Sequence, residues 1–262
     1  MSAEVVEHGA GKEGGRTFVR FSFSQRLEHI VQIFGFVTLC VTGIPQKYNG
    51  APWADSAIAL MGGIDLVRGI HRAFAIVLVL ELVFHVIAII WALAVKRVRW
   101  TMMPRWQDAK DALQMILFFV GVRKERARFD RYDFRQKVEY LALIWGTVVM
   151  IATGFCMWFP VEVTHYVSGE LIAAAKAAHS GEGLLAFASI LLWHMYSAHL
   201  SPDVFPFDKT IFTGKISEER MKHEHPLEYE RLMAEERAKA EAAAKEAAAK
   251  EAASTEAALK EP

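Results

Sequence analysis

Cysteine is scarce in this chain, and the scarcity excludes several kinds of site. The 262 residues include only two cysteines, Cys40 and Cys156. Their spacing matches no iron–sulphur or zinc pattern and offers no disulfide framework. No molybdenum-binding or flavin-binding motif is present either. We therefore interpret both cysteines as structural thiols and expect no substrate-converting site in this chain.

Long apolar stretches are abundant. Hydrophobic residues make up 53% of the chain, which includes 17 phenylalanines and 7 tryptophans. Four windows are long and apolar enough to span a bilayer as helices, namely 27–44, 70–95, 138–159 and 179–200. We therefore predict an all-α membrane protein with a four-helix transmembrane bundle. Charged residues within the second and fourth windows should face the interior of the bundle; they are Arg72, Glu81 and Glu182.

Two of these windows each contain a pair of histidines. His71 and His85 stand at positions i and i+14 of one window, and His179 and His194 stand at i and i+15 of the other. On an α-helix these steps bring each pair to roughly one face, about 21–22 Å apart along the axis. Two such helices side by side would offer one opposed His–His pair near each leaflet. This geometry is typical of two bis-histidine b haems, with His71/His179 and His85/His194 as axial ligands.

Other interpretations of these histidines are open. A single histidine within a membrane can serve only as a hydrogen-bonding group between helices. Four at matched depths favour ligation, because ionisable groups inside a bilayer are costly and mostly functional. A proton-linked transporter that uses the histidines and Glu81 as a relay is the competing class, and a structural anchor is a second alternative. Transporters typically have broken helices at the midplane, whereas neither two-histidine span contains a proline, and the glycines of the second span lie close to its first histidine.

The two halves of the chain repeat one another. Residues 23–43 align with residues 134–154 at an offset of 111, and the matches include Gln25/Gln136, Glu28/Glu139, Gly35/Gly146 and Thr42-Gly43/Thr153-Gly154. The histidine pairs continue the repeat at offsets of 108 and 109. We therefore predict two helical hairpins whose histidine helices run parallel. The glycines in mid-helix allow a close neighbour, either another helix or the face of a porphyrin.

Basic residues predict the orientation of the bundle. Residues 96–135 contain eleven lysines and arginines, whereas the short loops have only Lys47 and Arg68 in one and Lys176 in the other. The middle loop and both termini are therefore predicted to be cytoplasmic. We divide the chain into a polar N-terminal segment (1–20), a four-helix domain (21–212) and a charged, Ala-rich cytoplasmic tail (213–262).

Two further helices are predicted outside the spans. Residues 102–120 fit an amphipathic helix that lies in the membrane interface or docks on a cytoplasmic partner. From about residue 217 the tail is rich in Ala, Glu and Lys. This composition favours a solvated helix with no apolar stripe to bury. We expect His223 and His225 in the tail to be exposed to solvent.

Three motifs carry a resemblance to a known family. They are RLEH followed by an apolar run that ends in TG (26–43), IHRAFA (70–75), and HSGEG with WHMYSAHL (179–200). Over roughly residues 18–212 the chain resembles the di-haem cytochrome b membrane subunits of respiratory oxidoreductases. These include the gamma subunits of formate dehydrogenases, the cytochrome b subunits of nickel–iron hydrogenases and bacterial cytochrome b561-type anchors. The resemblance implies a place in the bacterial inner membrane.

The resemblance also implies an alternative haem ligand. In formate dehydrogenase gamma subunits a first-helix histidine in an RxxH setting ligates the cytoplasmic haem with a fourth-helix histidine, and here it matches His29. We favour His85/His194, because the duplication supplies this pair symmetrically and the second copy of His29 is Tyr140. His29 would then be free for a quinone pocket. The pairing His29/His194 stays open, as does a third haem between His29 and His199, which otherwise serves as a hydrogen-bonding group.

These patterns predict a membrane-embedded b-type cytochrome subunit that transfers electrons between a quinone pool and a redox partner subunit. The partner would be an iron–sulphur or multihaem c-type protein. A bis-histidine site leaves no open coordination position, which favours electron transfer over oxygen activation. Candidate quinone residues are Arg26, Glu28 and His29, with Glu81 as a further one. The expected partners are quinone, the redox subunit and the lipid bilayer, without nucleic acid.

Overall fold

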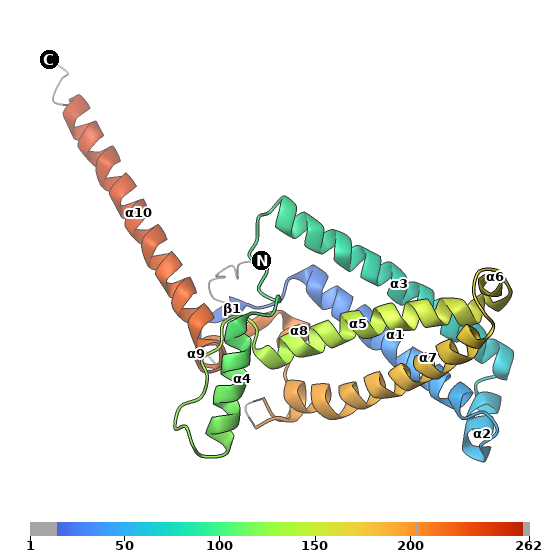
Figure 1. Ribbon diagram of the computed structural model, residues 1–262. Coiled ribbons are helices and arrows are strands. Elements are labelled where there is room, and N and C mark those ends of the chain that lie inside the picture. Colours follow the sequence, from blue (N-terminus) through green and yellow to red (C-terminus); the bar gives the residue numbers. More distant parts are fainter. Residues whose placement is uncertain (1–14, 203, 259–262) are drawn as a thin grey trace. The chain divides into compact units, whose positions relative to one another are not determined.

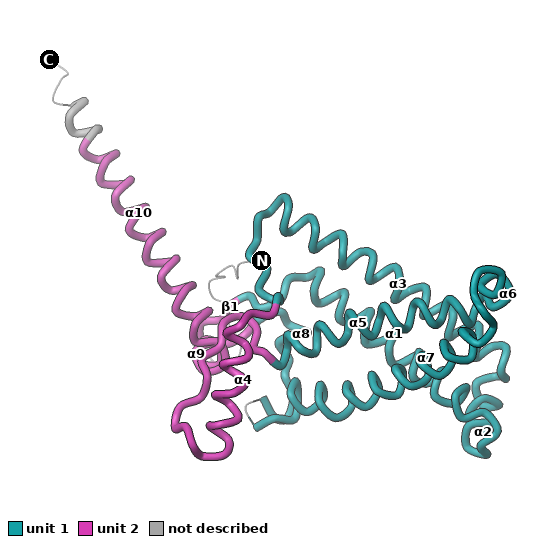
Figure 2. The backbone as a smooth tube through the Cα atoms, in the orientation of Figure 1, with its two compact units in different colours: residues 1–2, 19–103, 135–215 teal, residues 3–18, 104–134, 216–262 magenta. Residues whose placement is uncertain are grey.

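The computed structural model of the chain describes residues 15–202 and 204–258, with side chains up to residue 252. This part is almost entirely helical, and two short strands, β1 (Thr17–Val19) and β2 (Lys215–Ser217), pair with each other. The chain divides into two compact units (Figure 2). Of the described residues, unit 1 comprises 19–103 and 135–215, and unit 2 comprises 15–18, 104–134 and 216–258.

Four long apolar helices form unit 1 (Figure 1): α1 (Phe23–Lys47), α3 (Ile64–Ala94), α5 (Phe134–Trp158) and the continuous helical stretch Glu170–Leu200. In the described part of the chain, these four are long and apolar enough to cross a membrane. Large apolar side chains such as Leu80, Trp145 and Leu192 are more than half exposed, as lipid-facing residues are. The predicted all-α membrane fold is therefore confirmed, and each helix begins several residues before its predicted window.

Short helices connect the long ones and complete two hairpins. α2 (Pro52–Leu60) joins α1 to α3, and α6 (Pro160–Thr164) joins α5 to α7 at the same end of the unit (Figure 1). Both begin with a proline, whose fixed φ suits the first turn of a helix. α1 itself begins at a capping box between Ser22 and Gln25. A last short helix, α8 (Thr210–Thr213), follows the fourth span.

The fourth span differs from the second in its winding. α7 (Glu170–Ala188) continues into two π-helical stretches, η1 (Ser189–His194) and η2 (Tyr196–Leu200). A π turn holds about one more residue than an α turn, so its residues advance less around the axis. His85 follows His71 by 14 residues in the regular helix α3, whereas His194 follows His179 by 15. The π winding explains this difference of one residue. The π winding absorbs the additional residue and keeps the second histidine on a comparable face.

Unit 2 contains α4 (Trp106–Phe119), α9 (Glu218–Glu224) and α10 (Pro226–Ala258). Its core consists of Phe18, Ile216, Met221 and Leu232. The expectation that the tail has no apolar residues to bury was therefore wrong for its first third. The reason is that the Ala, Glu and Lys residues that dominate the tail as a whole lie C-terminal to this apolar portion, and α10 is exposed from residue 237 to residue 252.

The two histidines of the tail differ in exposure. His223 is exposed, as predicted. His225 is 6% exposed, and its Nδ1 lies 2.9 Å from the carbonyl oxygen of Asp130. The prediction that His225 is exposed to solvent was wrong, because a backbone acceptor from residues 104–134 satisfies its buried ring.

The predicted division of the chain differs from the compact units. Residues 104–134, which we had included in the four-helix domain, belong to unit 2 together with the tail. Most of the predicted polar segment 1–20 lies outside the described residues. In α4 only Met115 is buried, whereas Trp106 and Phe119 are at least 70% exposed. Contact of α4 with the membrane interface or with a partner stays a prediction.

Candidate haem sites

His71 of α3 and His179 of α7 face each other inside unit 1. The centroids of their imidazole rings are 6.4 Å apart, and the ring planes are inclined by 66°. Both rings are half-buried. They come from the parallel helices of the two hairpins, so the structure brings together the first of the predicted pairs.

A threonine orients each of these imidazoles. His71 Nδ1 lies 2.8 Å from the Thr42 hydroxyl, and His179 Nδ1 lies 3.0 Å from the Thr153 hydroxyl. Each threonine donates its only O–H to the carbonyl four residues earlier, at 2.7 Å for Thr42 and 2.6 Å for Thr153. The hydroxyl oxygen therefore accepts a hydrogen bond from the imidazole, so Nδ1 carries the hydrogen and Nε2 keeps its lone pair. Both rings are thus prepared to bind a metal through Nε2.

The glycine after each threonine leaves space for the ring. A Cβ atom on Gly43 would lie 3.0 Å from His71 Cε1, and one on Gly154 would lie 3.3 Å from His179 Cε1. Such contacts are tighter than ordinary packing allows. In the sequence the Thr–Gly doublet is visible only as a match between the two copies. In each copy it lies in the helix that precedes the first histidine, and this recurrence could have identified the orienting threonines.

His29 of α1 and His194 of η1 form a second facing pair. Their ring centroids are 6.3 Å apart, and the planes are inclined by 41°. His194 Nδ1 lies 3.1 Å from Glu139 Oε2, so the carboxylate accepts the Nδ1–H and Nε2 keeps its lone pair. His29 Nδ1 is buried without a hydrogen-bond partner among the described residues. The His29 ring therefore has an uncommitted nitrogen.

His85 is engaged with other groups. Its Nδ1 lies 2.6 Å from Glu28 Oε2, and its Nε2 lies 2.9 Å from the Tyr140 hydroxyl. The structure thus makes the alternative contact, His29 with His194, and not the favoured contact of His85 with His194. Tyr140 occupies the repeat position of His29, and it contacts His85 as His29 contacts His194.

The spacing of both facing pairs suits a metal ion between the rings. With metal–nitrogen bonds of about 2 Å, and about 1 Å from nitrogen to ring centre, two axial imidazoles have centroids roughly 6 Å apart. The observed distances are 6.4 Å and 6.3 Å. Two imidazoles on opposite sides of one iron are the axial ligands of a six-coordinate haem. The residues of both pairs therefore fit haem ligation.

The mid-helix glycines have side chains of the adjacent helix as neighbours. A Cβ on Gly35 would lie 2.4 Å from Leu78 Cδ2, and one on Gly146 would lie 2.6 Å from Glu182 Oε1. The sequence left open whether each glycine faces another helix or a porphyrin. Among the described residues, both glycines face a side chain of the adjacent helix.

Comparison with protein families decides the class of this membrane protein. The family model for prokaryotic cytochrome b561 matches residues 20–202, a range that includes all four long helices and both facing histidine pairs. The chain belongs to the prokaryotic cytochrome b561 family. It is therefore a multi-pass bacterial membrane cytochrome of the b type that functions in electron transfer, and its cofactor is haem b. Nothing in the comparison favours the proton-linked transporter.

Curated relatives of this cytochrome b561 include a subunit of a respiratory enzyme. The cytochrome b556(Fdn) subunit of the nitrate-inducible formate dehydrogenase of Escherichia coli (strain K12) is 21% identical over 224 residues, which cover 86% of this chain and 95% of the relative. The corresponding subunit of Shigella flexneri matches to the same extent. The resemblance inferred from the sequence motifs is thus confirmed.

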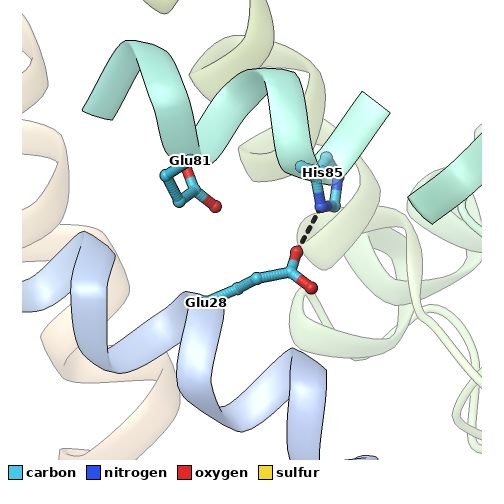
Figure 3. Close-up of side chains that lie close together, drawn as sticks. All are labelled: Glu28, Glu81 and His85. Atoms are coloured by element: carbon cyan, nitrogen blue, oxygen red, sulfur yellow. Dashed lines mark hydrogen bonds and ion pairs between the residues drawn. The ribbon is translucent and has the colours of Figure 1, made fainter. Parts of the chain in front are cut away.

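The remaining candidate residues of the cytochrome lie around these pairs. The His199 ring stacks on Phe207, with centroids 4.3 Å apart and planes within 3°, while His29 faces His194, so the structure does not make a His29–His199 pair. Arg26 Nε is buried without a hydrogen-bond partner among the described residues. Glu81 lies close to Glu28 and His85, with the ligand atoms of all three within 4.8 Å of one another (Figure 3).

Proposed function

We propose that this cytochrome carries two b haems and transfers electrons across the membrane between a quinone and a redox partner subunit. His71 and His179 hold one haem, and His29 and His194 hold the other. The observation that supports this assignment is the presence of two facing imidazole pairs with centroids 6.4 Å and 6.3 Å apart. With the orientation predicted from the basic residues, the His29/His194 haem lies on the cytoplasmic side.

The protein side chains fix the ligands and exclude water. Haem b supplies one-electron transfer at its iron, and two imidazole ligands leave no coordination position for oxygen. Thr42, Thr153 and Glu139 hold three of the four rings in the orientation and protonation state that ligation needs. The apolar surfaces of the four helices keep the sites within the hydrocarbon region.

A quinone and a partner subunit complete the proposal. The relatives are subunits of formate dehydrogenases, and we extend to this chain the assembly with a redox subunit, an iron–sulphur or multihaem c-type protein. Arg26 lies three residues before His29 near the start of α1, and its buried, unpartnered Nε–H can donate to a quinone oxygen. Glu28 precedes His29 in α1, and its carboxylate contacts His85.

The direct test is to count the haems. A dithionite-reduced-minus-oxidised spectrum of the purified chain, with haem measured as the pyridine haemochrome, should give two b haems per polypeptide. His71→Ala and His179→Ala should each remove the same one of the two. Quinol added to membranes should reduce the haems of the unmodified protein. A folded, colourless protein from haem-replete cells would contradict the proposal.

A further inference from the structure

The repeat relates the His29–His194 pair to a second site in unit 1. Glu139 lies 3.1 Å from His194 Nδ1, and the repeat-related Glu28 lies 2.6 Å from His85 Nδ1. In the second site Tyr140 replaces the other histidine and contacts His85 Nε2 at 2.9 Å. If His29–His194 holds iron, as proposed above, the second site keeps the carboxylate–imidazole half of a metal site and has lost the other imidazole.

An additional carboxylate distinguishes the second site. Glu81 lies one turn before His85 on α3, and the ligand atoms of Glu28, Glu81 and His85 lie within 4.8 Å of one another. Figure 3 shows the two carboxylates and the imidazole converging from α1 and α3. The repeat positions of Glu81, Ser189 or Ile190, carry no carboxylate. The second site has therefore gained a metal-binding group that the haem site lacks.

The negative charges of the two carboxylates favour the binding of a cation. Carboxylates in a membrane-spanning helix are costly unless a positive charge lies beside them. Among the described residues, His85 is the ion-pair partner of Glu28, and Glu81 makes neither a hydrogen bond nor an ion pair. All three side chains are half-buried. A divalent cation between them would neutralise both carboxylates and give Glu81 a partner.

We propose that Glu28, Glu81 and His85 bind a divalent ion of the zinc type. One imidazole nitrogen with two carboxylate oxygens is a donor set that zinc accepts, whereas calcium and magnesium take oxygen donors. Zinc bonds of about 2.0–2.2 Å place neighbouring ligand atoms roughly 3.3 Å apart. The ligand atoms of the three residues lie within 4.8 Å of one another without a metal, and binding of zinc would require them to shift to this spacing. Zinc would replace the Nδ1 hydrogen that Glu28 accepts, and this proton would be released to the solvent. Tyr140 would stay on Nε2 and orient the imidazole, as outer partners of metal-bound histidines do.

Zinc binding to the purified holo-cytochrome tests the site. The detergent-solubilised protein is stripped with a chelator and titrated with Zn²⁺ against a chromogenic competitor. We expect one zinc per chain. Glu81→Gln and His85→Asn should each weaken binding by about tenfold or more, since each removes one ligand. Glu182→Gln, which removes an intramembrane carboxylate outside the cluster, should bind zinc like the unmodified protein.

Two results would overturn the zinc site. One is an unmodified protein that binds no zinc, and the other is a Glu81→Gln variant with unchanged affinity. Haem content measured on the same samples shows that each variant is folded. It also separates the two proposals, because two haems without zinc reject only the zinc site, whereas absence of haem rejects the proposed function.

Discussion

At the scale of single residues, the groups that orient the histidines differ between the two proposed haem sites. Neutral threonine hydroxyls accept the hydrogen bonds of His71 and His179, whereas a carboxylate, Glu139, accepts that of His194. A negatively charged acceptor makes the imidazole a stronger electron donor to the metal and so stabilises the oxidised iron. The reduction potential of each haem should therefore depend on its own orienting residue.

Glu139→Gln tests this difference without a large change of shape. Removal of the charge should raise the reduction potential of one haem and leave that of the other unchanged, as measured by a spectroelectrochemical redox titration. Thr153→Val serves as the matched control, because it removes the acceptor of His179 and should affect the other haem. Equal shifts of both potentials in Glu139→Gln, or no shift, would contradict the assignment of Glu139 to His194.

Gly43→Ala tests the space beside His71. The added Cβ would lie 3.0 Å from His71 Cε1, and overpacking of this kind costs about 1–3 kcal/mol. We expect the variant to lose haem from the His71/His179 site and to unfold at a lower temperature. Gly69→Ala is the control, because a Cβ at Gly69 meets nothing within 4 Å. Equal haem content in the two variants would show that the ring does not need the glycine.

At the scale of elements, the apolar windows were sufficient to predict all four long helices, because length and hydrophobicity alone define a span. They could not predict the π winding of Ser189–Leu200, which changes the direction of side chains without changing composition. The same limit applies to the tail. Met221 and Leu232 are buried in unit 2, but they lie in a sequence whose average composition is that of a solvated helix.

A buried ion pair in unit 2 gives a prediction at this scale. Arg131 Nη1 lies 2.8 Å from Glu228 Oε1, and the two side chains are 6% and 1% exposed. Glu228→Gln removes a buried negative charge that lies beside the Arg131 guanidinium, and breaking a buried ion pair of this kind costs about 3–5 kcal/mol. Amide hydrogen exchange in α9 and the start of α10 should become faster, whereas the exposed control Glu241→Gln should exchange like the unmodified protein. Unchanged exchange in Glu228→Gln would contradict a stabilising role for the pair.

At the scale of the whole molecule, the internal duplication explains both what the sequence predicted and what it did not. Each hairpin repeats a Thr–His contact and a Glu–His contact, as Thr42–His71 and Glu28–His85 show for the first. Strict symmetry between the hairpins predicts that His85 pairs with His194. In the structure His85 instead contacts Glu28 and Tyr140, and His194 faces His29.

The symmetry of the repeat could not resolve this choice. Depth along a helix follows from residue spacing, but which two helices face each other at that depth depends on packing between the hairpins. The substitution of Tyr140 for the second copy of His29 was visible in the sequence. It makes the two halves chemically different, since the Tyr140 phenol contacts His85 Nε2, and the proposed pairing leaves His85 out of haem ligation.

The haem content of His29→Ala, measured beside that of His85→Ala, tests the central claim most directly. Both variants are purified from haem-replete cells, and haem per polypeptide is determined as the pyridine haemochrome. The account predicts that His29→Ala keeps one b haem and His85→Ala keeps two. Two haems in His29→Ala with one in His85→Ala would contradict the account and restore the pairing of His85 with His194.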